Sequence, residues 1–419
     1  MFIALGVFLA LVCALLYVNL SAGEKRVTHE IEHLYPVDHP QFFRAMGMLL
    51  GPDIVRGNRV KALMNGDEIF PAMLEAIRDA KQTVLFETFI YWSGPIGDQF
   101  AEALSERARA GVQVYVLLDW VGSIKVADEL LDRMKEAGVK VHRFHPLCWY
   151  NLGRINNRTH RKLLIVDGCV GFTGGVGIAP PWEGHAQDVD HWRDCHFRVD
   201  GPVVAQMQSV MLSNWSKTTG YILHGPDFFP ELEPRGDQMA QMFHSSPSGG
   251  SESMQLMYMM AITAAVKSID IASAYFVPDE MARVTLVAAM QRGVRVRIIT
   301  PGKHTDQPLV RYASRALWGD LLRAGAEIYI YQPTMYHCKM VLVDGLLASV
   351  GSTNFDPRSF HLNDEANLNV YDAGFTRELT EVFERDLQRC KKVDLAQWEA
   401  RPALEKARER MTALLAPIL

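Results

Sequence analysis

The chain has 419 residues, of which 48% are hydrophobic and 22% are charged, so it is long enough for two globular domains and too apolar to be intrinsically disordered. Its formal net charge of −5 argues against a nucleic-acid-binding protein that works by neutralising many phosphates. The six cysteines form no CxxC pair and show no metal-ligand spacing. We therefore expect no metal, no cofactor and no nucleic-acid partner.

The N-terminal residues, 1–22, form an apolar run without a charge. About 20 helical residues cross roughly 30 Å of hydrocarbon, so the run predicts a transmembrane anchor. A cleaved signal peptide is the alternative, but the run is long and no positive residue precedes it. Lys25 and Arg26 follow it, which predicts a single-pass protein with its globular part in the cytoplasm. Residues 23–58 are consistent with both a membrane-surface segment and a plain linker.

An internal repeat follows, because the same order of helices and strands is predicted twice. The matching segments are 71–92, 100–119 and 130–146 in the first copy and 259–276, 282–301 and 321–333 in the second. Helices that alternate with short Val- and Ile-rich strands predict an α/β fold with a mixed, mostly parallel sheet flanked by helices. We expect one lobe over residues 59–230 and another over residues 231–396.

Each copy contains the motif H-x-K-x4-D-G, formed by His160, Lys162 and Asp167 in the first copy and by His337, Lys339 and Asp344 in the second. Residues i and i+2 of a strand face the same way, so each His–Lys pair shares one surface. Seven residues after each Asp begins a turn of small residues, Gly174-Gly175-Val176-Gly177 in the first copy and Gly351-Ser352-Thr353-Asn354 in the second. Two matches in register with an independent repeat are not chance.

The C-terminal residues, 397–419, have apolar positions at helical spacing opposite a charged face, which predicts an amphipathic helix. Its apolar positions are Leu404, Met411, Leu414, Leu415 and Ile418. Both a helix packed on the second lobe and a helix at the membrane interface fit this pattern.

The two motifs resemble the phospholipase D superfamily, whose signature is H-x-K-x4-D in two copies with a downstream G-G/S-x-N turn. The resemblance covers about residues 60–390, and stretches such as HWRDCHFRVDGP and GSTNFDPRSFHLNDEANL are most similar to bacterial cardiolipin synthases. It implies two phospholipase D-like lobes related by a pseudo-twofold axis, and a location in the bacterial inner membrane. One departure is Gly177, which stands where the second copy has Asn354, so the first copy supplies one polar phosphate contact fewer.

Exchanging one alcohol for another on a phosphodiester needs a nucleophile and an acid, and one imidazole cannot serve as both at once. We therefore expect His160 and His337 to flank one phosphate. The resemblance favours His160 as the nucleophile that forms a phosphohistidine and His337 as the acid and base, with the reverse assignment open. Lys162 and Lys339 are expected to stabilise the negative charge that builds on the non-bridging oxygens without a metal.

The residues around the motifs have supporting roles. Asp194 and Glu365 resemble the family's acidic partners, which hold the second ring nitrogen of each histidine. Further phosphate contacts are expected from Ser352, Asn354, Gly174 and Gly175. The arginines near the first motif, which either attract anionic lipid head groups or form a solvated loop, are Arg154, Arg158 and Arg161. Asp167 and Asp344 are expected to stabilise turns, while Trp182 and Trp192 suit either an interfacial rim or the core.

The resemblance implies a membrane-anchored phosphatidyltransferase like cardiolipin synthase. It would transfer a phosphatidyl group from phosphatidylglycerol to a second phosphatidylglycerol and release glycerol. The alternative is a phospholipase D or other phosphodiesterase, including a nuclease, that gives the same intermediate to water. The outcome depends on whether the pocket walls exclude water and admit a lipid alcohol. A catalytically silent membrane scaffold is disfavoured because both motifs are intact.

Overall fold

The computed structural model describes residues 29–146, 157–246 and 253–414, together with residues 6, 8, 11 and 12. In this part of the chain, no helix combines the length and the apolar character that crossing a membrane requires. Apart from those four positions, the predicted transmembrane anchor at residues 1–22 lies outside the described residues.

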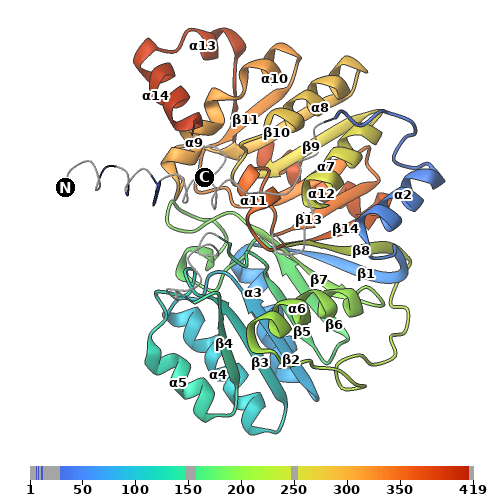
Figure 1. Cartoon of the computed structure of the whole chain (residues 1–419), viewed down its shortest axis with the longest axis vertical. Coiled ribbons are helices and arrows are strands. Elements are labelled where there is room, and N and C mark those ends of the chain that lie inside the picture. The colour runs from blue at the N-terminus through green and yellow to red at the C-terminus, as the bar shows by residue number, and fades with distance from the viewer. Residues whose placement is uncertain are drawn as a thin grey trace.

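Both halves of the chain contain helices and strands in a similar order (Figure 1). The first half contains α2 (Pro40–Leu50), β1 (Val55–Met64), α3 (Asn65–Asp79), β2 (Thr83–Thr88), α4 (Pro95–Arg109), β3 (Gln113–Asp119), α5 (Asp128–Glu136), β4 (Lys140–Phe144), β5 (Leu163–Val166), β6 (Val170–Gly174), the 3-10 helix η2 (Pro180–Trp182), β7 (Cys195–Asp200) and α6 (Val204–Thr219). The second half contains β8 (Gln238–Ser245), α7 (Ser253–Ala264), β9 (Ser268–Ser273), α8 (Glu280–Gln291), β10 (Arg295–Pro301), α9 (Pro308–Ala316), α10 (Gly319–Arg323), β11 (Glu327–Tyr331), β12 (Lys339–Val343), β13 (Leu347–Gly351), α11 (Pro357–His361), β14 (Glu365–Tyr371), α12 (Ala373–Leu387), β15 (Cys390–Lys392), α13 (Leu395–Glu399) and α14 (Ala403–Ala413).

One mixed sheet of 15 strands runs through the described part of both halves. The first half has the strand order β4-β3-β2-β5-β6-β7-β1, and the second half repeats it as β11-β10-β9-β12-β13-β14-β8, with β15 added at its outer edge. Strands β1 and β8 pair antiparallel at the junction, so the two sheets expected from the repeat form one continuous sheet. The motif strands β5 and β12 occupy equivalent positions in it.

The prediction of a mostly parallel sheet is wrong. Among the described strands, parallel pairing is confined to β2–β3–β4 and to β9–β10–β11. After each motif strand the chain turns back at an Asp-Gly pair, Asp167-Gly168 or Asp344-Gly345, and all four residues have a positive φ between 51° and 68°. Positive φ at both central positions gives a type I′ hairpin turn, which makes the following strand antiparallel.

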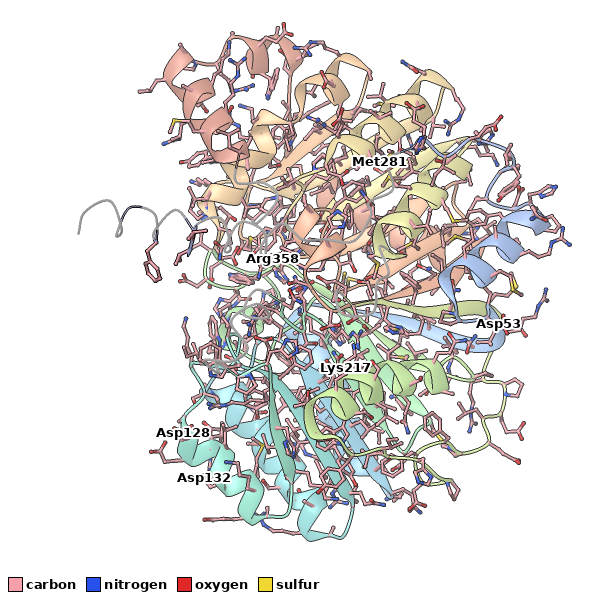
Figure 2. The ribbon with its side chains drawn as sticks, in the orientation of Figure 1. Asp53, Asp128, Asp132, Lys217, Met281 and Arg358 are labelled. Carbon is pink, nitrogen blue, oxygen red and sulfur yellow. The ribbon has the colours of Figure 1, made fainter. Side chains whose placement is uncertain are left out.

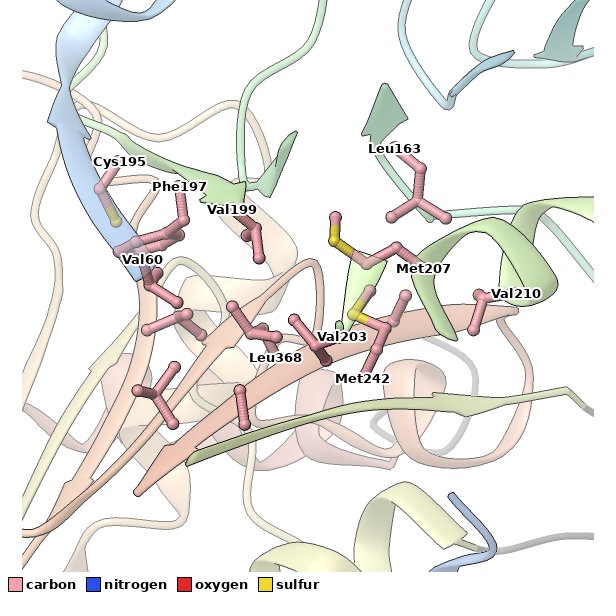
Figure 3. Close-up of a cluster of buried hydrophobic side chains, with 14 of the residues drawn as sticks. Val60, Leu163, Cys195, Phe197, Val199, Val203, Met207, Val210, Met242 and Leu368 are labelled. Carbon is pink, nitrogen blue, oxygen red and sulfur yellow. The ribbon is translucent and has the colours of Figure 1, made fainter. Parts of the chain in front are cut away.

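The two halves share a hydrophobic core beneath the junction of the sheet (Figure 3). Val60 and Phe197 from the first half belong to the same buried cluster as Met242 and Leu368 from the second half. Because interiors are packed at near-crystalline density, this shared core fixes the position of one half relative to the other. Residues brought together at the junction are therefore held rigidly.

The segment before β1 belongs to the folded body. Helix α2 packs on the second half, where Phe42 and Met46 are fully buried and the Phe42 ring lies 6.4 Å from that of Tyr371. Helix α2 is therefore a packed element of the fold and not a plain linker. The reason is its apolar period, since Phe42, Met46 and Leu50 recur every four residues and form one helix face.

The C-terminal residues form two helices, α13 and α14, where the sequence predicts one. Pro402 interrupts them and lies immediately before α14, where its missing N–H costs no helical hydrogen bond. Helix α14 packs on α9 through Arg315, which pairs with Glu405 at 2.7 Å and with Glu409 at 3.3 Å. Residues 415–419 lie outside the described part of the chain.

Candidate active site

The two motif histidines line one pocket of about 650 Å³. His160 precedes β5, and its backbone N–H donates to the carbonyl oxygen of Asp364 at 2.8 Å. His337 precedes β12, and its N–H donates to the carbonyl oxygen of Arg193 at 2.7 Å. Each motif is thus hydrogen-bonded to the other half of the chain, at the residue just before that half's candidate acid.

Each imidazole contacts a carboxylate from the opposite half. His160 Nδ1 lies 3.0 Å from both carboxylate oxygens of Glu365, and His337 Nδ1 lies 2.7 Å from Asp194 Oδ2. A carboxylate at Nδ1 favours the tautomer with a proton there, which leaves Nε2 free to react. The structure therefore places Glu365 of the second half beside His160 of the first motif. It places Asp194 of the first half beside His337 of the second motif.

Burial determines the ionisation of the imidazoles. It lowers the pKa of His160 to about 4 and that of His337 to about 3, and the nearby lysine ammonium groups add to the effect. Burial alone would raise the pKa of Asp194 and of Glu365, but the contacts with the histidines and lysines outweigh it and hold both pKa values below the ordinary range. At neutral pH the free site therefore contains two neutral imidazoles and two carboxylates.

The motif lysines are buried beside the histidines. Lys162 Nζ donates to the His160 carbonyl at 2.7 Å, and Lys339 Nζ donates to the His337 carbonyl at 2.6 Å and lies 3.0 and 3.1 Å from the two His337 ring nitrogens. Burial lowers the pKa of Lys162 to about 7 and also lowers that of Lys339. A phosphodiester bound beside these ammonium groups would raise both pKa values, because a negative charge favours the protonated form.

The two carboxylates are supported differently. Ser352 Oγ donates to Glu365 at 2.5 Å, whereas Trp182 Nε1 donates to Asp194 at 2.9 Å. A Cβ on Gly175 would lie 2.3 Å from Asp194 Oδ1, and one on Gly177 would lie 3.1 Å from the Trp182 ring. The glycines of the first turn therefore leave room for the Trp182 indole. This indole donates to Asp194 as the Ser352 hydroxyl donates to Glu365 in the other half.

Trp182 is a site residue that the sequence does not assign. Its ring lies 5.3 Å from that of His337, and the ring of Trp192 lies at the same distance. Gly175 and Gly177 are the sequence signal that could have indicated it, because they stand where the second turn has Ser352 and Asn354.

Of the four residues expected to contact phosphate through their turns, only Asn354 lines the pocket. Asn354 lines the pocket, and its side-chain oxygen has no hydrogen-bond partner among the described residues. The Ser352 hydroxyl is instead bound to Glu365, and neither Ser352, Gly174 nor Gly175 is among the residues that line the pocket. In the second turn, the side-chain amide of Asn354 therefore lines the pocket, while Ser352 hydrogen-bonds to the Glu365 carboxylate.

The arginines near the first motif also differ in placement. Arg158 lines the pocket and lies 3.9 Å from the buried Asp119. Arg358, which also lines the pocket, lies near the junction of the two halves (Figure 2). Arg161 is fully buried and donates to the carbonyls of Val210 and Ser245, so a contact between Arg161 and lipid head groups is excluded. Residue 154 lies outside the described residues.

The aspartates of the two motifs lie at the far ends of the motif strands. The Asp167 carboxylate accepts hydrogen bonds from the backbone N–H groups of Lys81, Gln82 and Thr83. Asp344 accepts the equivalent bonds from Val266, Lys267 and Ser268. Each carboxylate thus satisfies backbone donors where the chain enters the neighbouring strand.

The pocket walls are chemically unequal. The first half contributes mainly apolar side chains, Phe89, Ile90, Trp92, Val121, Trp182 and Trp192. The second half contributes mainly polar ones, Tyr275, Asp306, Gln307, Asn354, Asp356, Arg358, Ser359 and Asn363. A substrate with both an apolar body and a polar head group matches such a pocket.

A cluster of possible metal ligands also lies beside the site. Potential ligand atoms of Asp194, Cys195 and Cys338 lie within 4.8 Å of one another, and all three residues are buried. Burial raises the pKa of the Cys338 thiol well above its ordinary value, and a thiol must lose its proton to bind a metal. Asp194 is already bound to His337 and Trp182. These groups fit a buried structural cluster better than a metal site.

Comparison with known proteins places this arrangement in a family. The family profile described as "Cardiolipin synthase, PLD-like domain" matches residues 73–183 and 258–387, more than half of the chain. The chain is 36% identical over 365 residues to a cardiolipin synthase of Geobacillus kaustophilus (strain HTA426), covering 86% of this chain and 72% of the relative. It is 34% identical over 380 residues to cardiolipin synthase A of Pseudomonas syringae pv. syringae (strain B728a), covering 90% and 78%.

The fold has a solved counterpart. The crystal structure of phosphatidylserine synthase from Haemophilus influenzae Rd KW20 aligns with a TM-score of 0.67 at 14% identity, covering 90% of this chain and all of that one. At this identity the likeness concerns the fold alone. The family profile and the sequence matches show that the chain belongs to the cardiolipin synthase family of phospholipase D-like enzymes.

Proposed function

We propose that the protein transfers a phosphatidyl group from one phosphatidylglycerol to the terminal hydroxyl of a second and releases glycerol. The observation that carries the proposal is the pairing of His160 with Glu365 and of His337 with Asp194 across the two halves, in one pocket. This arrangement supplies a nucleophile and a proton donor, each with its own carboxylate, for one phosphorus atom.

In the first step, one imidazole attacks the phosphorus of the donor lipid in line with the departing glycerol. An N–P bond forms and the bond between phosphorus and the glycerol oxygen breaks, while the other imidazole gives its proton to that oxygen. We assign attack to His160 and proton donation to His337, following the family resemblance. Lys162 and Lys339 stabilise the charge on the non-bridging oxygens.

In the second step, the deprotonated His337 accepts the hydroxyl proton of the acceptor lipid. The acceptor oxygen then attacks the phosphohistidine, and the N–P bond breaks to regenerate neutral His160. A pKa of about 3 leaves His337 unprotonated in the free site at neutral pH. The acid role therefore needs the negative phosphodiester, which raises the pKa of a nearby imidazole as it binds.

The pocket walls favour a lipid acceptor over water. The aromatic rings of Phe89, Trp92, Trp182 and Trp192 line the pocket. The Phe89 ring lies 5.2 Å from that of His160, and those of Trp182 and Trp192 each lie 5.3 Å from that of His337. Apolar walls disfavour an ordered attacking water and provide surface for a lipid. Hydrolysis of the same intermediate, as by a phospholipase D or a nuclease, is the alternative outcome.

The same proposal includes the membrane as the site of action. The apolar residues 1–22 would anchor the chain in a bacterial inner membrane, and Lys25 and Arg26 would keep the catalytic body on the cytoplasmic side. No metal or other cofactor is assigned a role in the reaction.

The test is an incubation of purified full-length protein with labelled phosphatidylglycerol in vesicles, followed by separation of the lipid products. Equal amounts of cardiolipin and glycerol support transfer, whereas phosphatidic acid shows that water is the acceptor. His160→Ala and His337→Ala should each abolish conversion, while His185→Ala, which changes a surface histidine paired with Asp67, should not. A near-normal rate in either motif variant would contradict the mechanism.

A further inference from the structure

Helix α14 buries polar residues and exposes apolar ones, which is the reverse of an ordinary surface helix. Its buried residues are Glu409 and Thr412, with 0% and 8% exposure. Its large apolar residues Leu404, Met411 and Leu414 are 82%, 70% and 81% exposed. A surface helix normally buries its apolar stripe, so this exposed stripe requires an explanation.

Polar contacts fix α14 in this orientation. Glu409 pairs with Arg401 at 2.9 Å and with Arg315 of α9 at 3.3 Å, and all three side chains are at most 17% exposed. The Arg408 guanidinium lies 3.8 Å from the centre of the Tyr312 ring on α9. Rotating the helix to bury its apolar stripe would expose and break these buried ion pairs. The apolar stripe therefore stays on the outside.

The helix that carries the exposed stripe packs on α9, and α9 contributes to the lining of the pocket. Helix α9, on which α14 packs, begins after Gln307 and contains Val310, and both residues line the pocket. Figure 1 shows α9 between α14 and the junction of the halves. Leu309 in α9 is 51% exposed. On the first half, the loop after β3 contributes the exposed Ile124 next to the pocket residue Lys125. Both halves thus present exposed apolar side chains next to residues that line the pocket.

The charges on α14 indicate what covers it. Its two glutamates, Glu405 and Glu409, pair with arginines on the protein side. Among the described residues, the ion pairs of α14 include neither the half-exposed Lys406 nor the exposed Arg410. An apolar stripe bordered by basic residues matches an anionic lipid surface, where the stripe enters the acyl boundary and the basic groups meet the phosphates.

We propose that the apolar face of α14, formed by Leu404, Met411 and Leu414, docks into the surface of an anionic bilayer and turns the pocket mouth toward the lipid. The inference rests on the proposed function in one respect, namely that the pocket takes its substrates from a membrane. It assigns the C-terminal helix to the membrane interface while keeping it bound to α9. It thus adds a second membrane contact to the predicted N-terminal anchor.

The experiment places an environment-sensitive NBD fluorophore on α14 in full-length protein reconstituted into vesicles that contain phosphatidylglycerol. Met411→Cys carries the label, and Met48→Cys on α2 is the matched control, since Met411 and Met48 are 70% and 78% exposed. The two helices lie at opposite sides of the molecule (Figure 1). Wild-type protein taken through the same labelling gives the background from native thiols. Quenching by aqueous iodide and by doxyl-labelled lipid is measured at both positions.

The expected result at position 411 is emission shifted to shorter wavelength, strong quenching by doxyl lipid and iodide quenching several-fold weaker than at position 48. Equal iodide access at the two positions overturns the proposal. Iodide protection without doxyl quenching also overturns it, because it shows a second copy or the chain's own N-terminal segment on the face. The readout needs no turnover, so its failure is distinguishable from a failure of the proposed reaction.

Discussion

Replacing Glu365 with Gln removes one negative charge from the site and leaves its shape almost unchanged. The variant loses the charge-assisted contact with His160 Nδ1 at 3.0 Å, while its side-chain oxygen can still accept from Ser352. A hydrogen bond to a charged group contributes about 1.5–3 kcal/mol, and each 1.4 kcal/mol corresponds to about a tenfold change in rate. We therefore expect Glu365→Gln to lower kcat/KM for cardiolipin formation roughly 10- to 150-fold.

The same substitution should also move the pH profile. Burial lowers the pKa of Lys162 to about 7, and the charge of Glu365 opposes that shift. Without this charge the pKa of Lys162 falls further, so the Lys162 ammonium loses its proton at a lower pH than in the wild type. The alkaline limb of kcat/KM should therefore shift toward acid in Glu365→Gln. The assay is cardiolipin formation on phosphatidylglycerol vesicles over a range of pH.

The matched control is Glu87→Gln. Glu87 is also fully buried, but its carboxylate accepts from Thr159 and Asn214 and contacts neither motif histidine. It should leave the position of the alkaline limb unchanged. The reasoning is refuted if folded Glu365→Gln keeps a rate within about threefold of the wild type and shows an alkaline limb at the wild-type pH. A threefold loss is smaller than the loss of one such hydrogen bond would cause.

Three further outcomes follow from the site. Trp182→Phe removes the indole donor to Asp194 and should slow turnover roughly three- to tenfold, about 1 kcal/mol, with the fold intact by circular dichroism; an unchanged rate would remove Trp182 from the site. In the wild type, activity should fall as the pH rises through the Lys162 pKa of about 7, and the limb of kcat should lie above that of kcat/KM, because bound phosphate raises this pKa. Coincident limbs would contradict this. Asp167→Ala leaves three backbone N–H groups without their acceptor and should lower the unfolding free energy by about 2 kcal/mol in urea titration; a loss below about 0.5 kcal/mol would show that water replaces the carboxylate.

The repeat and the paired motifs are the parts of the structure that sequence patterns predict best. The repeated order of segments corresponds to the repeated strand order. The motif spacing is the same after His160 and after His337, and it places both residues at equivalent strands, β5 and β12. Such patterns are informative because strand period and chain order are local properties. The Asp-Gly pairs also carried a hairpin signal, but the helix–strand alternation led to the wrong expectation of a mostly parallel sheet.

Contacts between distant segments are what the patterns could not supply. The carboxylate partner of His337 is supported by Trp182, whose role depends on space left by the glycines of the first turn. Helix α14 shows the same limit, since its period predicts an amphipathic helix but not which face is buried. That choice is made by Glu409, whose partners Arg315 and Arg401 lie outside the helix.

The central claim is that both halves act on a single phosphorus atom. A crystal structure of the protein with orthovanadate, which mimics a pentacoordinate phosphoryl group, tests it most directly. We predict one vanadate in the pocket, with the Nε2 atoms of His160 and His337 on its opposite sides and the ammonium groups of Lys162 and Lys339 on its equatorial oxygens. Vanadate bound to one histidine while the other faces a separate cavity would contradict the account.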